Sequence, residues 1–284
     1  MAVVLDGIAY GLQLAVLAVG LTLIYGLGGV LNLAHGQFAV VAAIAASLLL
    51  GGGLPTVWAV LAAVALGAVL ALAVDASLMR PVYRLRGEAR VLLSLLLTIG
   101  LAFVIDGLLV YNYPSAALRL NIPGPAIGLL GVPMRRGALA ASLLSLVALG
   151  VLIVFLRYTR RGKAVRSIIQ NEEGAQLCGI NPARVRTAVF VLSGALAGVA
   201  AIAEGMTSSL GSTDGVGLTI EALIVTVVGG LGSVAGALLA GLLLGIVYAL
   251  ATYHIGAYVT SIILLVAAMA TILLRPSGLL GRGA

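Results

Sequence analysis

Two groups of polar residues stand out in a chain that is 62% hydrophobic and only 9% charged. The first group interrupts an apolar run near the N-terminus and consists of Asn32, His35, Gly36 and Gln37. The second is the stretch 157–186, which holds seven of the sixteen basic residues and an adjacent glutamate pair. Polar groups within apolar segments are costly and usually serve transport, gating or proton transfer. A charged stretch between apolar segments suits contact with a partner.

The first group lies in the sequence GLGGVLNLAHGQ (26–37), where glycines precede the polar residues. If this segment is helical, Asn32 and His35 are one turn apart and share a face. We expect the group to line or gate a translocation path. The alternative is a hydrogen-bonded staple that satisfies backbone groups freed by a break in the helix. A metal site is not expected, because His254 is the only other histidine and the single cysteine, Cys178, lies in the charged stretch.

A second interruption, GGLGS (229–233), lies inside the apolar run 219–252, which is too long for one membrane helix. Broken helices in corresponding positions of two halves indicate a transport site near the membrane midplane. The alternative is that the glycines only let two helices pack closely. We predict broken or re-entrant helices near 29–36 and 229–233. The gating residues expected in the second break are Gly229, Gly230, Gly232 and Ser233.

The charged stretch has the pattern of a docking element. Residues 164–177 can form one short amphipathic helix, Gly179 supplies a helix stop, and Asn181 with Pro182 starts a turn into the next helix. Such a helix at the membrane face suits a groove on a soluble partner. The alternative is a solvated basic anchor with no partner.

The sequence contains no phosphate-binding loop of its own. Gly162 and Lys163 are followed by Ala164 rather than Ser or Thr, and no earlier glycine has the required spacing. If transport is driven by ATP, the nucleotide therefore binds another chain. Ser193, in VLSGALAG, could serve as an intramembrane nucleophile, but a serine beside glycine in a membrane helix is typical of a packing surface.

Apolar runs long enough to cross about 30 Å of hydrocarbon as helices recur along the whole chain. They lie near 7–28, 37–53, 55–78, 91–111, 138–156, 187–206, 219–252 and 256–274. We therefore predict an all-α polytopic membrane bundle of about eight segments. It is expected to form a single domain over 1–284.

The net charge of +7 is an orientation signal, because the basic residues concentrate in the connections. The positive-inside rule places loops 79–90 and 157–186 in the cytoplasm, together with the tail that carries Arg275 and Arg282. The loop 112–137, rich in proline and glycine, holds only three arginines and is expected outside and poor in helix. Nucleic-acid binding is not expected.

The N-terminus is apolar and lacks a basic region and a cleavage site, so we expect a retained first helix rather than a removed signal peptide. Its orientation stays open, because 37–53 and 219–229 could each span the membrane or only re-enter it.

Five motifs run almost from end to end of the chain. They are GLTLIYGLGGVLNLAHGQF (20–38), RPVYR (80–84), the charged stretch 157–186, EALIVTVVGGLGSVAGALLAGLLLGI (221–246) and RPSGLLGR (275–282). Their order and spacing resemble the inner-membrane permease subunits of bacterial branched-chain amino acid ABC importers. The resemblance implies a non-catalytic, multi-pass subunit that forms the translocation path.

The same resemblance implies the partners. They are a second homologous permease subunit, two ATP-binding cassette subunits and a periplasmic substrate-binding protein. ATP and Mg²⁺ are expected on the ATPase subunits, and no cofactor is expected on this chain. The family's N-x-A-H-G and GG-x-GS segments match the two interruptions. Its ATPase-coupling loop matches the charged stretch, where the expected coupling residues are Arg161, Arg166, Asn171, Glu172, Glu173, Gly179 and Ile180.

Two other functions stay open. Related permeases with the same motifs import urea and short amides. An ion-coupled secondary transporter that works without an ATPase is the main alternative from another class. Such a transporter needs an acidic residue within the membrane, and Asp106 is the best candidate.

Overall fold

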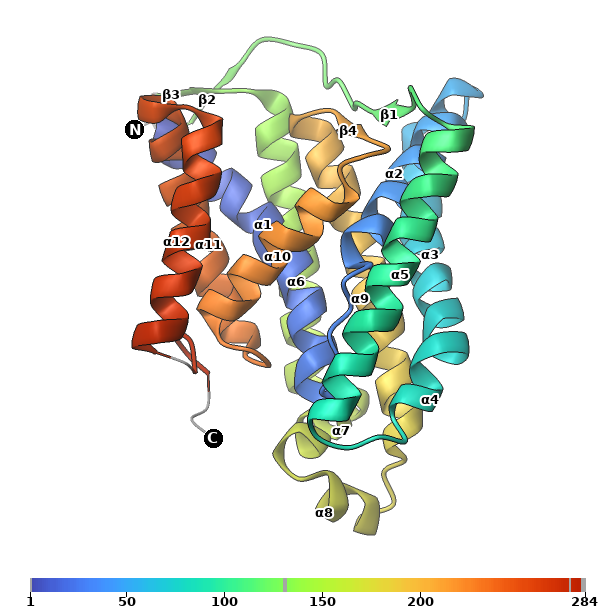
Figure 1. Ribbon diagram of the computed structural model, residues 1–284. Coiled ribbons are helices and arrows are strands. Elements are labelled where there is room, and N and C mark those ends of the chain that lie inside the picture. The colour runs from blue at the N-terminus through green and yellow to red at the C-terminus, as the bar shows by residue number, and fades with distance from the viewer. Residues whose placement is uncertain (1, 130–131, 276, 282–284) are drawn as a thin grey trace.

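The apolar runs of the sequence form long helices that extend between the two ends of the molecule (Figure 1). This computed structural model describes residues 2–129, 132–275 and 277–281. Arg282, which the sequence analysis places in a cytoplasmic tail, lies outside the described residues. The first helix starts at the end that carries the strands, and residues 277–281 lie toward the opposite end, where the short helices project (Figure 1).

Nine apolar helices make up the bundle within the described chain. They are α1 (Ala2–Gly28), α2 (His35–Gly51), α3 (Thr56–Val74), α5 (Glu88–Asn112), α6 (Arg136–Tyr158), α9 (Pro182–Thr207), α10 (Gly215–Gly229), α11 (Val234–Ile255) and α12 (Ala257–Leu274). The shorter elements are the π-helical turn η1 (Asp75–Met79), α4 (Arg80–Val82), α7 (Arg160–Gln170) and α8 (Glu172–Leu177).

The predicted all-α membrane bundle is confirmed. Six helices of the described chain are long and apolar enough to cross a membrane, with α3, η1 and α4 acting together as one of them. Three more apolar helices are shorter, and they include α2 and α10. Both short helices begin or end at a predicted interruption, so the polar and glycine-rich segments shorten them.

The breaks lie where the sequence predicts them. α1 ends at Gly28 and α2 begins at His35, so residues 29–34 run without regular structure between them. α10 ends at Gly229, and α11 begins only at Val234. Because Asn32 precedes α2, the expectation that it shares a helix face with His35 is wrong.

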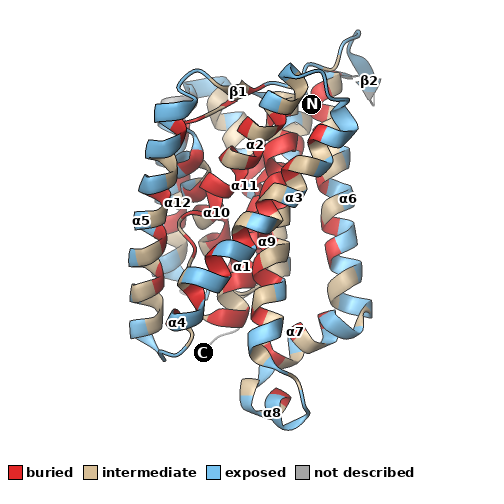
Figure 2. Ribbon diagram, turned by 90° about the vertical axis from the view of Figure 1, so that its right-hand side faces the viewer, coloured by how far each residue is buried: buried red, intermediate tan, exposed pale blue. Residues whose placement is uncertain are grey.

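Glycines bring the central helices into close contact. A Cβ on Gly11 of α1 would lie 2.7 Å from the Gly241 carbonyl oxygen of α11. On the other side of the bundle, a Cβ on Gly67 of α3 would lie 2.3 Å from the Gly194 carbonyl oxygen of α9. Small residues let membrane helices approach in this way. α1 is consequently the most buried of the six long helices, whereas α5 and α6 present apolar side chains outward (Figure 2).

The loop 112–137 forms short strands instead of helices in its described part. β1 (Ala117–Leu118) pairs antiparallel with β4 (Leu210–Gly211), and β2 (Ile127–Leu129) pairs antiparallel with β3 (Val132–Met134). The first pair ties the loop after α5 to the link between α9 and α10. The strands therefore close one end of the bundle (Figure 1).

The prediction of one amphipathic helix over 164–177 is wrong. The structure has two helices, α7 and α8, which separate at Asn171. The Asn171 backbone is extended, and its side-chain oxygen accepts a hydrogen bond from the Gly174 amide at 2.9 Å. An asparagine that caps a following helix in this way competes with continuation of the preceding one.

Candidate functional site

The first break is an extended segment, residues 29–34, held against α5 by two hydroxyl groups. Ser94 Oγ accepts a hydrogen bond from the Leu31 amide at 3.1 Å, and Thr98 Oγ1 accepts one from the Leu33 amide at 3.0 Å. Ser94 and Thr98 are one turn apart on α5 and fully buried. Extended backbone inside a bundle needs such partners, because there is no water to supply them.

Ser94 and Thr98 were not among the functional residues predicted from the sequence. The sequence pattern that could have indicated them is a Ser and a Thr four residues apart in an otherwise apolar helix. The same pattern also fits hydroxyls that bond only to carbonyls of their own helix.

Replacing Thr98 by valine should destabilise this segment. The change conserves volume but leaves the partly buried Leu33 amide without its partner, at a cost of about 1–2 kcal/mol. The expected result is a lower midpoint of thermal unfolding for the purified protein in detergent. Thr271→Val is the matched control, because the Thr271 hydroxyl bonds within its own helix, to the Ala267 carbonyl, and to no other group of the described residues. Equal midpoints for the two variants would contradict the role of Thr98.

Asn32 and His35 shape the turn from this segment into α2. Asn32 Oδ1 accepts a hydrogen bond from the Ala34 amide at 3.1 Å, and His35 Nε2 lies 3.1 Å from the Leu17 carbonyl oxygen of α1. Both side chains are fully buried. Asn32 Nδ2 and His35 Nδ1 have no hydrogen-bond partner among the described residues. The contacts fit the staple interpretation of the pair, and its part in gating remains a prediction.

Gly36 and Gln37 join α2 to α10 and α5. The Gly36 amide donates to Thr219 Oγ1 at 2.9 Å, and Gln37 Nε2 donates to Asp106 Oδ2 at 3.3 Å. A Cβ on Gly36 would lie 2.0 Å from the Gly215 carbonyl oxygen, so the two backbones touch. Asp106 is thus a neighbour of the predicted gating group, which the sequence did not indicate.

The second break forms the opposite end of α10. Gly230 and Gly232 have φ values of 104° and 85°, which side-chain-bearing residues rarely adopt. The C-terminal segment packs on this turn, with the Leu279 amide donating to the Val228 carbonyl at 2.9 Å. Ser233 caps α11 by accepting a hydrogen bond from the Gly236 amide at 3.1 Å. α10 therefore connects the two predicted gating groups, one at each end.

The end of α1 contacts the second break directly. A Cβ on Gly26 would lie 2.9 Å from Gly232 Cα. A cavity of about 270 Å³ lies at the strand end of the bundle, and a larger one of about 570 Å³ opens beside the second break. Residues lining the larger cavity include Tyr25, Arg166, Gln170, Leu231 and Leu280.

α7 and α8 form the projecting end of the protein (Figure 1). Thr159 caps α7 through the Gly162 amide at 2.9 Å, and Val165 is buried against the bundle. The backbone of Gly179 has φ 80° and ends α8, where the Ile180 amide donates to the Ala175 carbonyl at 3.0 Å. Among the predicted coupling residues, the structure leaves exposed Arg161, Arg166, Asn171, Glu173 and Gly179.

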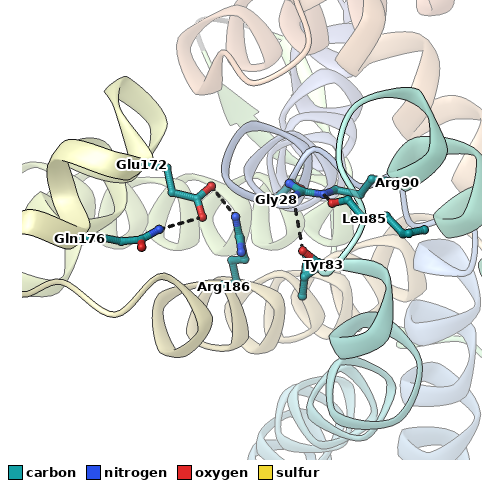
Figure 3. Close-up of polar contacts among 7 residues, drawn as sticks. All are labelled: Gly28, Tyr83, Leu85, Arg90, Glu172, Gln176 and Arg186. Atoms are coloured by element: carbon teal, nitrogen blue, oxygen red, sulfur yellow. Dashed lines mark hydrogen bonds and ion pairs between the residues drawn. The ribbon is translucent and has the colours of Figure 1, made fainter.

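The two glutamates at the start of α8 have different surroundings. Glu172 Oε2 pairs with Arg186 Nη2 of α9 at 2.5 Å, whereas Glu173 is exposed. Only 8% of the Arg186 surface is exposed, and its guanidinium carbon lies 5.0 Å from the centre of the Tyr83 ring. The adjacent Arg90 donates to the Gly28 carbonyl at 3.0 Å (Figure 3). Arg186 was not among the coupling residues predicted from the sequence.

Comparison with known proteins gives the family. The family described as "Branched-chain amino acid transport system / permease component" matches residues 3–274. This chain belongs to that permease family.

The permease is 31% identical to the high-affinity branched-chain amino acid transport system permease protein BraD of Pseudomonas aeruginosa, over 98% of this chain and 94% of that protein. It is 28% identical to the corresponding protein LivH of Escherichia coli K12, again over 98% and 94%. A chain of PsaBC from Streptococcus pneumoniae in complex with Fab shares the fold with a TM-score of 0.52. That alignment covers 95% of this chain and 89% of the other at 13% identity.

Proposed function

We propose that this permease is the membrane subunit of an ATP-driven importer and forms the translocation path for branched-chain amino acids. A second permease subunit, two ATPase subunits that bind ATP and Mg²⁺, and an external substrate-binding protein complete the importer. The similarity to BraD and LivH, which are branched-chain amino acid transport permeases by name, supports the substrate class. This chain itself is non-catalytic in the proposal.

The observation that carries the proposal is the α7–α8 projection. Leu177 at the end of α8 is 90% exposed, and Glu173 is exposed beside it. An apolar residue and a charge on a short, capped helix fit a groove on a soluble protein. A purely solvated basic anchor needs neither the ion pair between Glu172 and the buried Arg186 nor the exposed Leu177.

The charge distribution supports a cytoplasmic place for this projection in the inner membrane. Loops 79–90 and 157–186 with their basic residues lie at this end, and so does the C-terminal end of α12, which Arg275 caps. The loop 112–137 at the opposite end carries three. By the positive-inside rule, the projection and the C-terminal segment face the cytoplasm, and the start of α1 faces outward.

The test is purification of the tagged permease in mild detergent, followed by reconstitution of the co-purifying proteins in proteoliposomes. We expect an ATPase and a second permease to co-purify, and uptake of leucine, isoleucine and valine to require both ATP and the binding protein. Urea and acetamide serve as competing substrates. ATP-driven uptake of an amide instead of the amino acids would reject the substrate class. A homo-oligomer without an ATPase would reject the importer itself.

The contact of Asp106 with Gln37 is the one observation that favours an ion-coupled transporter. Asp106→Asn removes the charge but keeps the hydrogen-bonding ability of the side chain. The importer predicts ATP-driven uptake within about threefold of the unmodified protein, because the amide can still accept the bond from Gln37 at a cost below 1 kcal/mol. Complete loss of uptake, with normal ATP hydrolysis, would favour coupling to an ion.

A further inference from the structure

α8 is attached to the bundle through a buried arginine. The Glu172–Arg186 pair joins the first turn of α8 to the start of α9, and Gln176 Nε2 donates to the same glutamate at 3.4 Å. Arg186 is almost fully buried, and Glu172 is the one carboxylate that pairs with it among the described residues. Removing one partner of a buried ion pair leaves an uncompensated charge, whereas an exposed pair contributes little. Displacement of α8 therefore acts directly on Arg186.

The next contact in the series is the ring of Tyr83, which lies after α4. The guanidinium of Arg186 lies over this ring, and a Cβ on Gly28 would meet the ring at 3.0 Å. The ring thus lies close to both Arg186 and the last residue of α1. Burial raises the pKa of the Tyr83 hydroxyl, so the ring is neutral beneath the cation.

Arg90 fixes the far side of this contact. Its Nη1 donates to the Gly28 carbonyl at 3.0 Å, its Nε to the Leu85 carbonyl at 2.7 Å, and its Nη2 to the Tyr83 carbonyl at 3.4 Å. The end of α1 and the Tyr83 backbone are therefore held by one side chain. Gly29 follows with φ 59°, and the chain then enters the extended segment 29–34.

We propose that Arg186 and Tyr83 are positioning residues that transmit movement of α8 to the first helix break. The inference rests on the proposed function, because the movement of α8 would come from the ATPase. Two-state packed contacts, rather than distance alone, transmit such changes. The contacts run without a gap from Glu172 through Arg186 and Tyr83 to Gly28, where the helix ends.

The test uses the complete importer in proteoliposomes and compares uptake with ATP hydrolysis. Arg186→Gln should lower the amount of substrate transported per ATP by about tenfold, within the range found for residues that couple two sites. Arg184→Gln is the matched control: it removes an exposed arginine two residues away and should leave the ratio unchanged. An unchanged ratio in Arg186→Gln would overturn the proposal.

Substitutions of Tyr83 test the ring separately from folding. Tyr83→Phe keeps a ring under the guanidinium and should retain the transport ratio, whereas Tyr83→Leu should lose it to the same extent as Arg186→Gln. If Arg186→Gln fails to assemble into the importer, the comparison of Tyr83→Phe with Tyr83→Leu tests the proposal in its place. Equal ratios in the two Tyr83 variants would overturn the proposal.

A second measurement follows the break itself. In a Cys178→Ser background, the variant Leu31→Cys reports the exposure of the segment 29–34 to a thiol reagent. Addition of a non-hydrolysable ATP analogue should change the labelling rate of this cysteine when residue 186 is arginine. It should leave the labelling rate unchanged in the Arg186→Gln variant. An equal change of labelling rate in the two proteins would reject transmission through Arg186. Absence of ATP-driven uptake in the unmodified importer would instead reject the proposed function.

Discussion

Reversal of both glutamates, Glu172→Arg with Glu173→Arg, should abolish uptake while leaving the protein in the membrane. Two causes combine. One new arginine faces the buried Arg186, which repels α8 from the bundle, and the other inverts the exposed charge that a partner meets. The measurement is substrate uptake in cells, with the amount of membrane-inserted protein determined by immunoblot.

The control for this prediction is Glu88→Arg. Glu88 is exposed in the first turn of α5, at the same end of the molecule, so its reversal imposes the charge change of one Glu→Arg substitution, half that of the double variant, outside α8. We expect near-normal uptake in the control. Retained uptake in the double variant would remove the coupling function of α8.

Single neutral substitutions separate the two causes. Glu173→Gln should weaken co-purification of the ATPase, because the glutamate is exposed. Glu172→Gln should preserve co-purification and lower the transport obtained per ATP, because its carboxylate faces Arg186. If instead Glu172→Gln weakened co-purification and Glu173→Gln lowered the transport per ATP, α8 would present its other face to the partner.

Gly36→Ala is expected to have the largest effect on stability. The added methyl group would lie 2.0 Å from the Gly215 carbonyl oxygen and 2.6 Å from Thr219 Oγ1, so α2 and α10 must separate. Overpacking at such a contact costs about 3 kcal/mol, the upper end of the usual range. Separation also breaks the bond from the Gly36 amide to Thr219. We expect a markedly lower yield of folded protein and a lower unfolding midpoint by size-exclusion chromatography after heating.

Gly217→Ala is the matched control for that change. Gly217 is also on α10, but a Cβ there meets nothing within 4 Å. Alanine is favoured over glycine inside a helix, so the control should be as stable as the unmodified protein or slightly more stable. Equal loss of stability in Gly36→Ala and Gly217→Ala would contradict this explanation. It would show that close contact between α2 and α10 is not the cause of the loss.

The membrane bundle and its two breaks were predictable from the sequence. Hydropathy over windows of about twenty residues reports helices, and glycines next to polar residues report where a helix stops, because both depend on local backbone and solvation preferences. Gly230 and Gly232 are direct examples, since their φ values are nearly unique to glycine. Local preferences were less reliable at Asn171, where a side-chain cap ended one helix and began another.

Only the tertiary structure decided which side chains meet. Nothing in the sequence separates Glu172 from Glu173, yet one is paired with a buried arginine and the other is exposed. Ser94 and Thr98 became partners of a segment more than sixty residues earlier in the chain. Such pairings depend on how closely helices approach, which contacts between distant glycines such as Gly36 and Gly215 determine. The sequence by itself thus determined where helices run and break, and long-range packing decided what holds the breaks and what connects them to α8.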